Sequence, residues 1–174
     1  MAPSGFLTRF LKLFWTTLRV YLRGRESTPD KSPVTTEVEL VGPEDVLARF
    51  LFQKRHFKRS GPTPEAFMPP PDLRLSVYVI SELPDASIWT LGRDVLSKHP
   101  RPRLYGRADI AISAVHGQEL KAFRDDDPYR HVNVVGWPSY VDGKDRIKSI
   151  AQELARSASL RLLSTPMSKQ DQNA

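Results

Sequence analysis

The stretch Arg124–Pro138, RDDDPYRHVNVVGWP, places an acidic turn, an Arg-His pair, a short apolar run and a Gly-Trp-Pro stop next to one another. Asp and Pro occupy favoured turn positions in its first part. The run His131–Val135 is rich in β-branched residues and predicts a strand, which Trp137 and Pro138 end. A plain buried strand does not require three aspartates before it, and a solvated loop does not require a tryptophan. We therefore expect the flanks of this strand to face another group.

The segments before this stretch predict strands and a helix. Leu73–Ile80, LRLSVYVI, alternates apolar and other side chains and predicts a strand. A helix opens at Pro84 and ends before His99. Further strands are predicted at Tyr105–Ser113 and, shorter, at Leu120–Phe123.

Two more helices are predicted from apolar residues at helical spacing. The first runs from about Pro43 to Phe57, with proline at a favoured first position followed by two acids. Its apolar stripe consists of Val46, Leu47, Phe50 and Leu51. The second runs from about Lys144 to Leu163, and residues 164–174 are predicted to be a disordered tail.

Together these elements predict an α+β fold. We expect a small, mostly antiparallel sheet of three to four strands with packed helices, preceded by an amphipathic N-terminal helix. The predicted organisation is a helix over residues 1–23, a flexible linker over 24–36 and a domain over 37–163, followed by the tail. At 174 residues, the chain has room for one domain with extensions.

The composition excludes several kinds of site. The chain has no cysteine, which removes disulfides, thiol catalysis and iron–sulfur clusters. Four histidines without a metal-binding spacing do not predict zinc, so we expect neither a metal nor a cofactor. A net charge of +6 favours anionic partners such as nucleic acid, acidic lipid or an acidic protein.

Residues 6–22, FLTRFLKLFWTTLRVYL, predict a cationic amphipathic helix with a wide apolar arc. The run is too short and too interrupted by cations to span a membrane. Three interpretations remain open: docking onto this protein or a partner, binding at an anionic membrane interface, and a mitochondrial-type presequence. The candidate binding residues of this helix are Arg9, Lys12, Phe14, Trp15 and Arg19.

Two internal segments are basic. Lys54, Arg55, Lys58 and Arg59 form the first, and the loop HPRPR at residues 99–103 forms the second. Cations at a helix C-terminus are expected from the helix dipole alone, so a solvated end is one interpretation. A surface that contacts phosphate is the other.

His131 is the best acid–base candidate, because a carboxylate from the preceding aspartates would favour its charged form. The alternative is a turn followed by a histidine that only caps a strand edge. Ser76 and Ser113 are the nucleophile candidates, although neither lies in a Gly-x-Ser-x-Gly turn. We assign no catalytic residue at this stage. Arg130 and Trp137 are candidate binding residues, and Trp137 is also a candidate core anchor.

Several short motifs occur in an order that resembles a family of short, uncharacterised bacterial proteins. They are Phe67-Met68-Pro69, Ser76-Val77, Trp89 with Gly92, Pro128-Tyr129-Arg130-His131 and Gly136-Trp137-Pro138. The resemblance covers roughly residues 37–163. It implies a bacterial, cytoplasmic protein and no particular chemistry. Where that family leads us to expect Arg and His, this chain has Val79 and Tyr105.

From these features we expect a non-enzymatic binding or accessory module that engages a protein partner or an anionic surface. One alternative is a small ADP-ribosyltransferase-like or other nucleotide-handling enzyme, with Tyr78, Arg107 and His131 lining its pocket. A second alternative is a protein bound at a membrane interface. Nucleic acid is a further candidate partner. The expected location is the cytoplasm, with a peripheral membrane position as the alternative.

Overall fold

The computed structural model describes residues 41–169. The chain divides into the units Met1–Thr36 and Glu37–Ala174, and all described residues belong to the second. The predicted N-terminal helix, with its candidate residues Arg9, Lys12, Phe14, Trp15 and Arg19, lies outside them, as does the whole of the predicted linker over residues 24–36. The elements are β1 (Val46–Leu51), η1 (Lys54–His56), β2 (Phe57–Lys58), β3 (Gly61–Pro62), η2 (Pro64–Ala66), β4 (Leu75–Val79), α2 (Asp85–Lys98), β5 (Arg103–Ala111), α3 (Ile112–His116), β6 (Lys121–Arg124), β7 (His131–Val135), α4 (Lys144–Ser157) and β8 (Ser159–Ser168).

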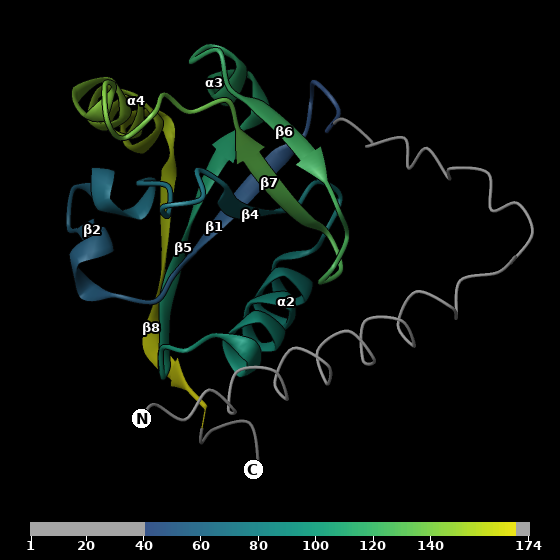
Figure 1. The fold of residues 1–174 in the computed structure, drawn as a ribbon. Helices are drawn as coiled ribbons and strands as arrows, with labels where there is room; N and C mark the ends of the chain where they lie inside the picture. The colour runs from purple at the N-terminus through teal and green to yellow at the C-terminus, as the bar shows by residue number, and fades with distance from the viewer. Residues whose placement is uncertain (1–40, 170–174) are drawn as a thin grey trace, which may run out of the picture. The chain divides into compact units, whose positions relative to one another are not determined.

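A single twisted sheet forms the centre of this unit (Figure 1). Its strand order is β6-β7-β4-β1-β5-β8, and every neighbouring pair is antiparallel. The predicted α+β class with a mostly antiparallel sheet is therefore confirmed. The sheet has six strands instead of the predicted three to four, because two strands were not expected from the sequence.

The first of these is β1, in the segment predicted to be a helix from Pro43 to Phe57. Residues 42–45 form a turn, in which the Asp45 backbone N–H donates to the Gly42 carbonyl at 3.1 Å. β1 lies at the centre of the sheet and is buried on both faces, so its apolar residues are nearly continuous. Adjacent apolar residues at 46–47 and 50–51 also match a helical stripe, which explains why the helix prediction was wrong.

The second is β8, where the sequence predicted the end of a helix and a disordered tail. The helix α4 ends at Ser157, and Ser159–Ser168 pairs with β5, which would otherwise be an edge strand. Ala158 and Leu162 continue the helical spacing of α4 by coincidence, so the predicted extension to Leu163 was wrong. Of the predicted tail, residues 164–168 belong to β8, and 170–174 lie outside the described residues.

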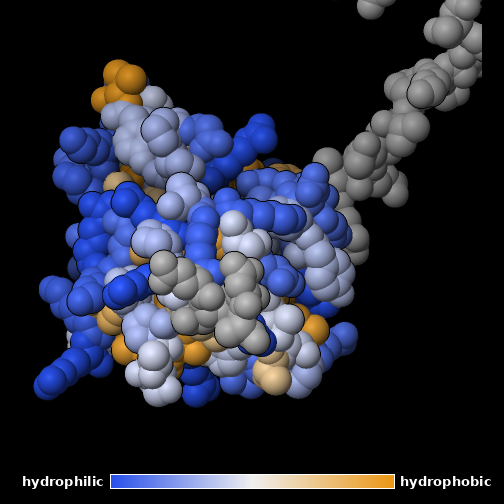
Figure 2. Space-filling model, turned by 90° about the horizontal axis from the view of Figure 1, so that it is seen from below, coloured by the Kyte–Doolittle hydropathy of each residue, from blue (hydrophilic) through white to orange (hydrophobic). Residues whose placement is uncertain are grey.

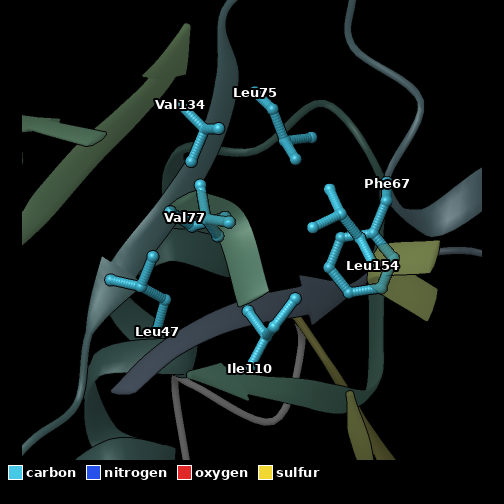
Figure 3. Close-up of a pocket in the computed structure, with 8 residues that line it drawn as sticks. Leu47, Phe67, Leu75, Val77, Ile110, Val134 and Leu154 are labelled. Carbon is cyan, nitrogen blue, oxygen red and sulfur yellow. The ribbon is translucent and has the colours of Figure 1, made fainter. Parts of the chain in front are cut away.

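Two apolar clusters lie on opposite faces of the sheet. Helix α2 packs on one face against Ala48, Phe50 and Tyr78. Helices α3 and α4 pack on the other face, which includes Leu47 and Val77. Figure 3 shows the second cluster, where Leu154 of α4 and Phe67 of the connector meet Leu47, Leu75, Val77, Ile110 and Val134 of the sheet. These side chains leave no room for a water molecule between them.

Trp137 belongs to the same cluster. It is 7% exposed, and its Nε1–H donates to the Val134 carbonyl at 3.0 Å. This is the position of a core anchor that ends β7. Figure 2 shows a different, solvent-facing side of the molecule, on which hydrophilic residues predominate and hydrophobic ones occur in small separate groups.

Candidate functional site

The pairing of β4 with β7 brings Ser76 and His131 together. Ser76 lies opposite Asn133, and Tyr78 lies opposite His131. Because side chains alternate along a strand, these four residues share one face of the sheet. It is the face on which α2 packs, since Tyr78 belongs to the α2 cluster.

A chain of hydrogen bonds runs from Ser76 through His131 to Asp125. The distance from Ser76 Oγ to His131 Nε2 is 2.7 Å, and that from His131 Nδ1 to the Asp125 carboxylate is 2.6 Å. An ionised carboxylate can only accept, so Nδ1 carries the hydrogen. In the neutral imidazole this leaves Nε2 as an acceptor for the Ser76 hydroxyl proton. A hydroxyl, an imidazole and a carboxylate therefore form a hydrogen-bonded chain of the kind that nucleophilic catalysis uses.

Asp125 is positioned by the loop between β6 and β7. The backbone N–H of Asp125 donates to the His131 carbonyl at 3.3 Å, which closes the loop. Asn133 Nδ2 donates to the second carboxylate oxygen of Asp125 at 2.6 Å. The predicted carboxylate neighbour of His131 among the three aspartates is therefore confirmed, and it is Asp125. Asp126 instead accepts from the Arg130 backbone N–H at 3.0 Å.

Arg130, a predicted binding residue, ties this loop to the end of β4. Its Nε donates to the Val79 carbonyl and its Nη2 to the Ser81 carbonyl, both at 2.7 Å. The backbone N–H of Val79 donates in return to the Arg130 carbonyl at 3.0 Å. The contacts of Arg130 thus hold the strand that follows Ser76 against the loop that carries Asp125.

Arg49 holds Ser76 from the other side. In the β1–β4 pairing, Leu47 lies opposite Val79 and Ala48 lies opposite Tyr78. Arg49 is the next residue of β1. Its Nη1 donates to the Ser76 carbonyl at 2.8 Å and its Nε to the Ala66 carbonyl at 3.0 Å. Although the residue keeps some solvent exposure, burial of the guanidinium lowers the pKa of Arg49 to about 10. It remains a cation at neutral pH.

Tyr78 lies against the edge of the His131 ring, with ring centroids 5.3 Å apart. Burial raises the pKa of Tyr78, while interaction with the Ser76 side chain and the charge of Arg49 oppose that rise. The phenol therefore keeps its proton at neutral pH and can serve as a donor. Ser76 itself is half-buried, and the Asp125 side chain is 43% exposed, so the hydrogen-bond chain lies at the boundary between core and solvent.

Arg107 does not join Tyr78 and His131, its partners in the ADP-ribosyltransferase-like prediction. It lies on β5, and β4 and β1 separate β5 from the His131 strand β7. Its Nη2 donates to Asp85 at 2.7 Å and its Nε to Asp109 at 2.9 Å. The guanidinium also lies 4.5 Å from the centre of the Trp89 ring. Only Tyr78 and His131 of that predicted set are neighbours.

The two basic segments come close to one another. Lys54, Arg55, Lys58 and Arg59 are exposed on η1, β2 and the following turn, and the charges of Arg55 and Arg101 both act on buried His56. The Phe57 ring contacts that of Tyr105, with centroids 5.9 Å apart. The cations at residues 54–56 belong to a 3₁₀ turn instead of the predicted end of an α-helix.

Most residues of this site were considered in advance, and two were missed. Those considered are Ser76, Tyr78, Arg130, His131 and the three aspartates before it, and those missed are Arg49 and Asn133. Ser76 and His131 lie in two of the motifs that carry the family resemblance, and that order of motifs was the only signal of their association. Arg49 and Asn133 had no signal in the sequence, and the sequence predicted an aspartate next to His131 without indicating which of the three it is. Ser113, the other nucleophile candidate, lies at the start of α3 instead.

Among residues 41–169, no group of three or more His, Asp or Glu side chains is placed to hold a metal ion. Within the same range, no helix has the length and apolar character needed to cross a membrane. No family model, curated protein or solved structure matches this chain.

Proposed function

We propose that the protein is a hydrolase that cleaves a carboxylic ester through a covalent intermediate on Ser76. The observation that carries this proposal is the chain of short hydrogen bonds: 2.7 Å from Ser76 Oγ to His131 Nε2 and 2.6 Å from His131 Nδ1 to Asp125. Each atom in it has the donor or acceptor role that the reaction needs. The non-enzymatic binding module expected from the sequence is the alternative, and we favour the hydrolase because the Ser76 hydroxyl lies next to the His131 ring.

In the first step, His131 Nε2 accepts the hydroxyl proton of Ser76 while Ser76 Oγ attacks the carbonyl carbon of the ester. The C–O bond to the leaving group then breaks, and the alcohol leaves with the proton from the imidazolium. In the second step, His131 accepts a proton from water, whose oxygen attacks the acyl carbon. Ser76 Oγ leaves with that proton, so that a carboxylic acid and the original enzyme remain.

Asp125 and Tyr78 would assist in different ways. Asp125 fixes the tautomer of His131 and stabilises the imidazolium, and Asn133 keeps the carboxylate in position. Tyr78 is the candidate donor to the negative charge that develops on the carbonyl oxygen, since its phenol is neutral and interacts with Ser76. Arg49 acts only on the backbone of Ser76 and is a positioning residue.

The test is covalent labelling with a fluorophosphonate probe. Ser76 Oγ attacks the phosphorus, its proton passes to His131, fluoride leaves, and the mass of the intact protein increases by that of the probe minus HF. We expect one label on the wild-type protein and none on Ser76→Ala. Ser113→Ala is the matched control, because Ser113 is an exposed serine in another element and should label as the wild type does.

Three results would overturn the proposal. One is a folded wild-type protein that takes no label and hydrolyses none of a panel of nitrophenyl esters. Another is a label that persists on Ser76→Ala. The third is labelling of Ser76 at an undiminished rate in His131→Gln, since the histidine would then not act as its base.

A further inference from the structure

Six exposed cations form a surface at the ends of β1 and α2 that the proposed reaction does not use. They come from two segments far apart in the sequence, and we call them the basic surface. Its members are Lys54, Arg55, Lys58, Arg59, Arg101 and Arg103. The buried ring of His56 lies in the first of these segments, and the one acid whose charge raises its pKa is Glu65.

Ring contacts fix the two segments to one another. The Phe52 ring at the end of β1 stacks on His99 at the end of α2, with centroids 3.8 Å apart and planes 15° from parallel. Phe57 and Tyr105 form a second contact between the same segments. The basic surface is therefore held by the fold, so its cations are brought together before any partner binds.

Hydrogen bonds from Thr63 also hold the turn that carries Arg55. Thr63 Oγ1 donates to the Arg55 carbonyl at 2.6 Å, and the Thr63 backbone N–H donates to the His56 carbonyl at 2.9 Å. His56 is 6% exposed and sits beneath the cations. Burial is the main reason that the pKa of His56 falls to about 4, and the charges of Arg49, Arg55 and Arg101 lower it further. At neutral pH, the charge of the surface thus comes from lysine and arginine alone.

The chemistry of these cations favours phosphate. Four of the six are arginines, whose planar guanidinium matches the oxygens of a phosphate in a bidentate way. Like charges held close together repel one another, and a partner with regularly spaced negative charges relieves that repulsion over the whole surface. A phosphodiester backbone has this spacing.

A membrane surface fits less well. Proteins that lie on an anionic membrane insert apolar side chains beside their cations. The large exposed apolar residues of the described chain are Tyr129, Val141 and Leu162, and none belongs to the two basic segments. Phe57 and Tyr105 are half-buried and packed against one another.

We propose that the basic surface binds the phosphate backbone of a nucleic acid, without regard to base sequence. The partner is a polyanion held by charge, so affinity falls steeply with salt concentration. This inference does not depend on the proposed hydrolase, since none of its residues touches Ser76 or His131. The net charge of the chain predicts an anionic partner, and this inference names nucleic acid as that partner.

The experiment uses the full-length chain and fluorescein-labelled oligonucleotides of random sequence, single-stranded and duplex, in an anisotropy titration over a series of salt concentrations. The test variant is Arg55→Glu with Arg101→Glu. We expect its Kd to rise by about tenfold or more, and the slope of log Kd against log salt to fall by about 2, because each lost phosphate contact removes close to one unit.

The matched control is Lys144→Glu with Arg146→Glu, which makes the same change in net charge. Both residues are exposed in the first turn of α4, where acids are favoured, so the variant should fold normally. Arg146 lies 4.0 Å from Glu119, which follows α3 and belongs to neither basic segment. We expect its Kd and salt slope to stay near those of the wild type. Ser76→Ala should also bind as the wild type does, which separates this proposal from the proposed enzyme.

Several outcomes would overturn the inference. Equal weakening in the test and control variants would show that only net charge matters. Unchanged binding in the test variant would place the contact elsewhere in the chain. If Arg55→Glu with Arg101→Glu loses binding to vesicles of phosphatidylcholine and phosphatidylserine but keeps the oligonucleotide affinity, the surface contacts membranes instead.

Discussion

Two histidines of this protein are almost equally buried, yet their surroundings differ in every other respect. His131 is 9% exposed and His56 is 6% exposed. Both ring nitrogens of His131 have a partner, a hydroxyl on one side and a carboxylate on the other. The Nδ1 atom of His56 has none in the structure, and the charges next to that ring are mainly cations.

This difference shows that burial alone does not make a histidine functional. A carboxylate on Nδ1 sets the tautomer of His131 and compensates the charge that the ring gains when it takes a proton. Cations around His56 oppose any such gain, so the ring stays neutral and serves as packing under the basic surface. The partners of each ring therefore decide which of the two can act as a base.

The largest expected effect comes from replacing both histidines in the same way. His131→Gln should slow fluorophosphonate labelling of Ser76 by ~10²–10⁴-fold, because the hydroxyl loses its base. His56→Gln, the matched control, should label at the wild-type rate per folded molecule. Labelling rates followed by intact mass, together with urea denaturation to count folded protein, measure both. Equal labelling rates in the two variants would contradict the claim that His131, and not His56, is the base for Ser76.

The second effect concerns stability against pH. His56 has a pKa of about 4 in the folded protein, and an unfolded chain would have about 6.5. Between these pH values the unfolded state binds a proton that the folded state does not. The contribution of His56 to the free energy of unfolding is therefore fully present above pH 6.5 and is lost as the pH falls toward 4. The loss from this one group is at most about 3 kcal/mol.

Urea denaturation at a series of pH values in this window measures that loss. The pKa of His99 is also lowered to about 4, chiefly by burial, so the wild type should show the sum of two contributions. His56→Leu should retain only the part due to His99. A wild-type free energy of unfolding that stays level from pH 6.5 to pH 4 would contradict the assignment of a neutral, cation-surrounded His56.

The smallest expected effect tests the support behind His131. Asn133→Ala removes the donor to the second oxygen of Asp125, and the carboxylate should then orient the imidazole less well. We expect labelling to slow by about tenfold, which corresponds to roughly 1.4 kcal/mol. Val135→Ala is the control on the same strand and face. If the two variants label alike, Asn133 has no part in positioning the base.

Part of this site was accessible from the sequence because it is local. Asp125 and His131 are 6 residues apart and joined by a turn, so a carboxylate next to the imidazole could be predicted from their spacing. The strand that carries His131 and the helix α2 were predicted correctly for the same reason, since turn residues and short-range periodicity mark them. The basic character of residues 54–59 also needed no structure.

The rest depended on contacts that no local pattern encodes. Ser76 and His131 are 55 residues apart, and they meet only because β4 pairs with β7 in one particular register. A shift of one residue would turn Ser76 to the opposite face and break the chain of hydrogen bonds. Arg49 reaches Ser76 only because β1 is a central strand, and that placement was hidden by apolar spacing that also suits a helix.

The sequence by itself determined which residues are able to do chemistry, how much charge they carry, and where the chain turns, because these properties depend on side-chain type and on neighbours a few residues away. Only the tertiary structure decided which of these residues meet. It placed a hydroxyl on one nitrogen of His131 and cations around His56, and it joined two separate basic segments into one surface. The physical reason is that strand pairing and burial on both faces of a sheet are set by the whole packed domain.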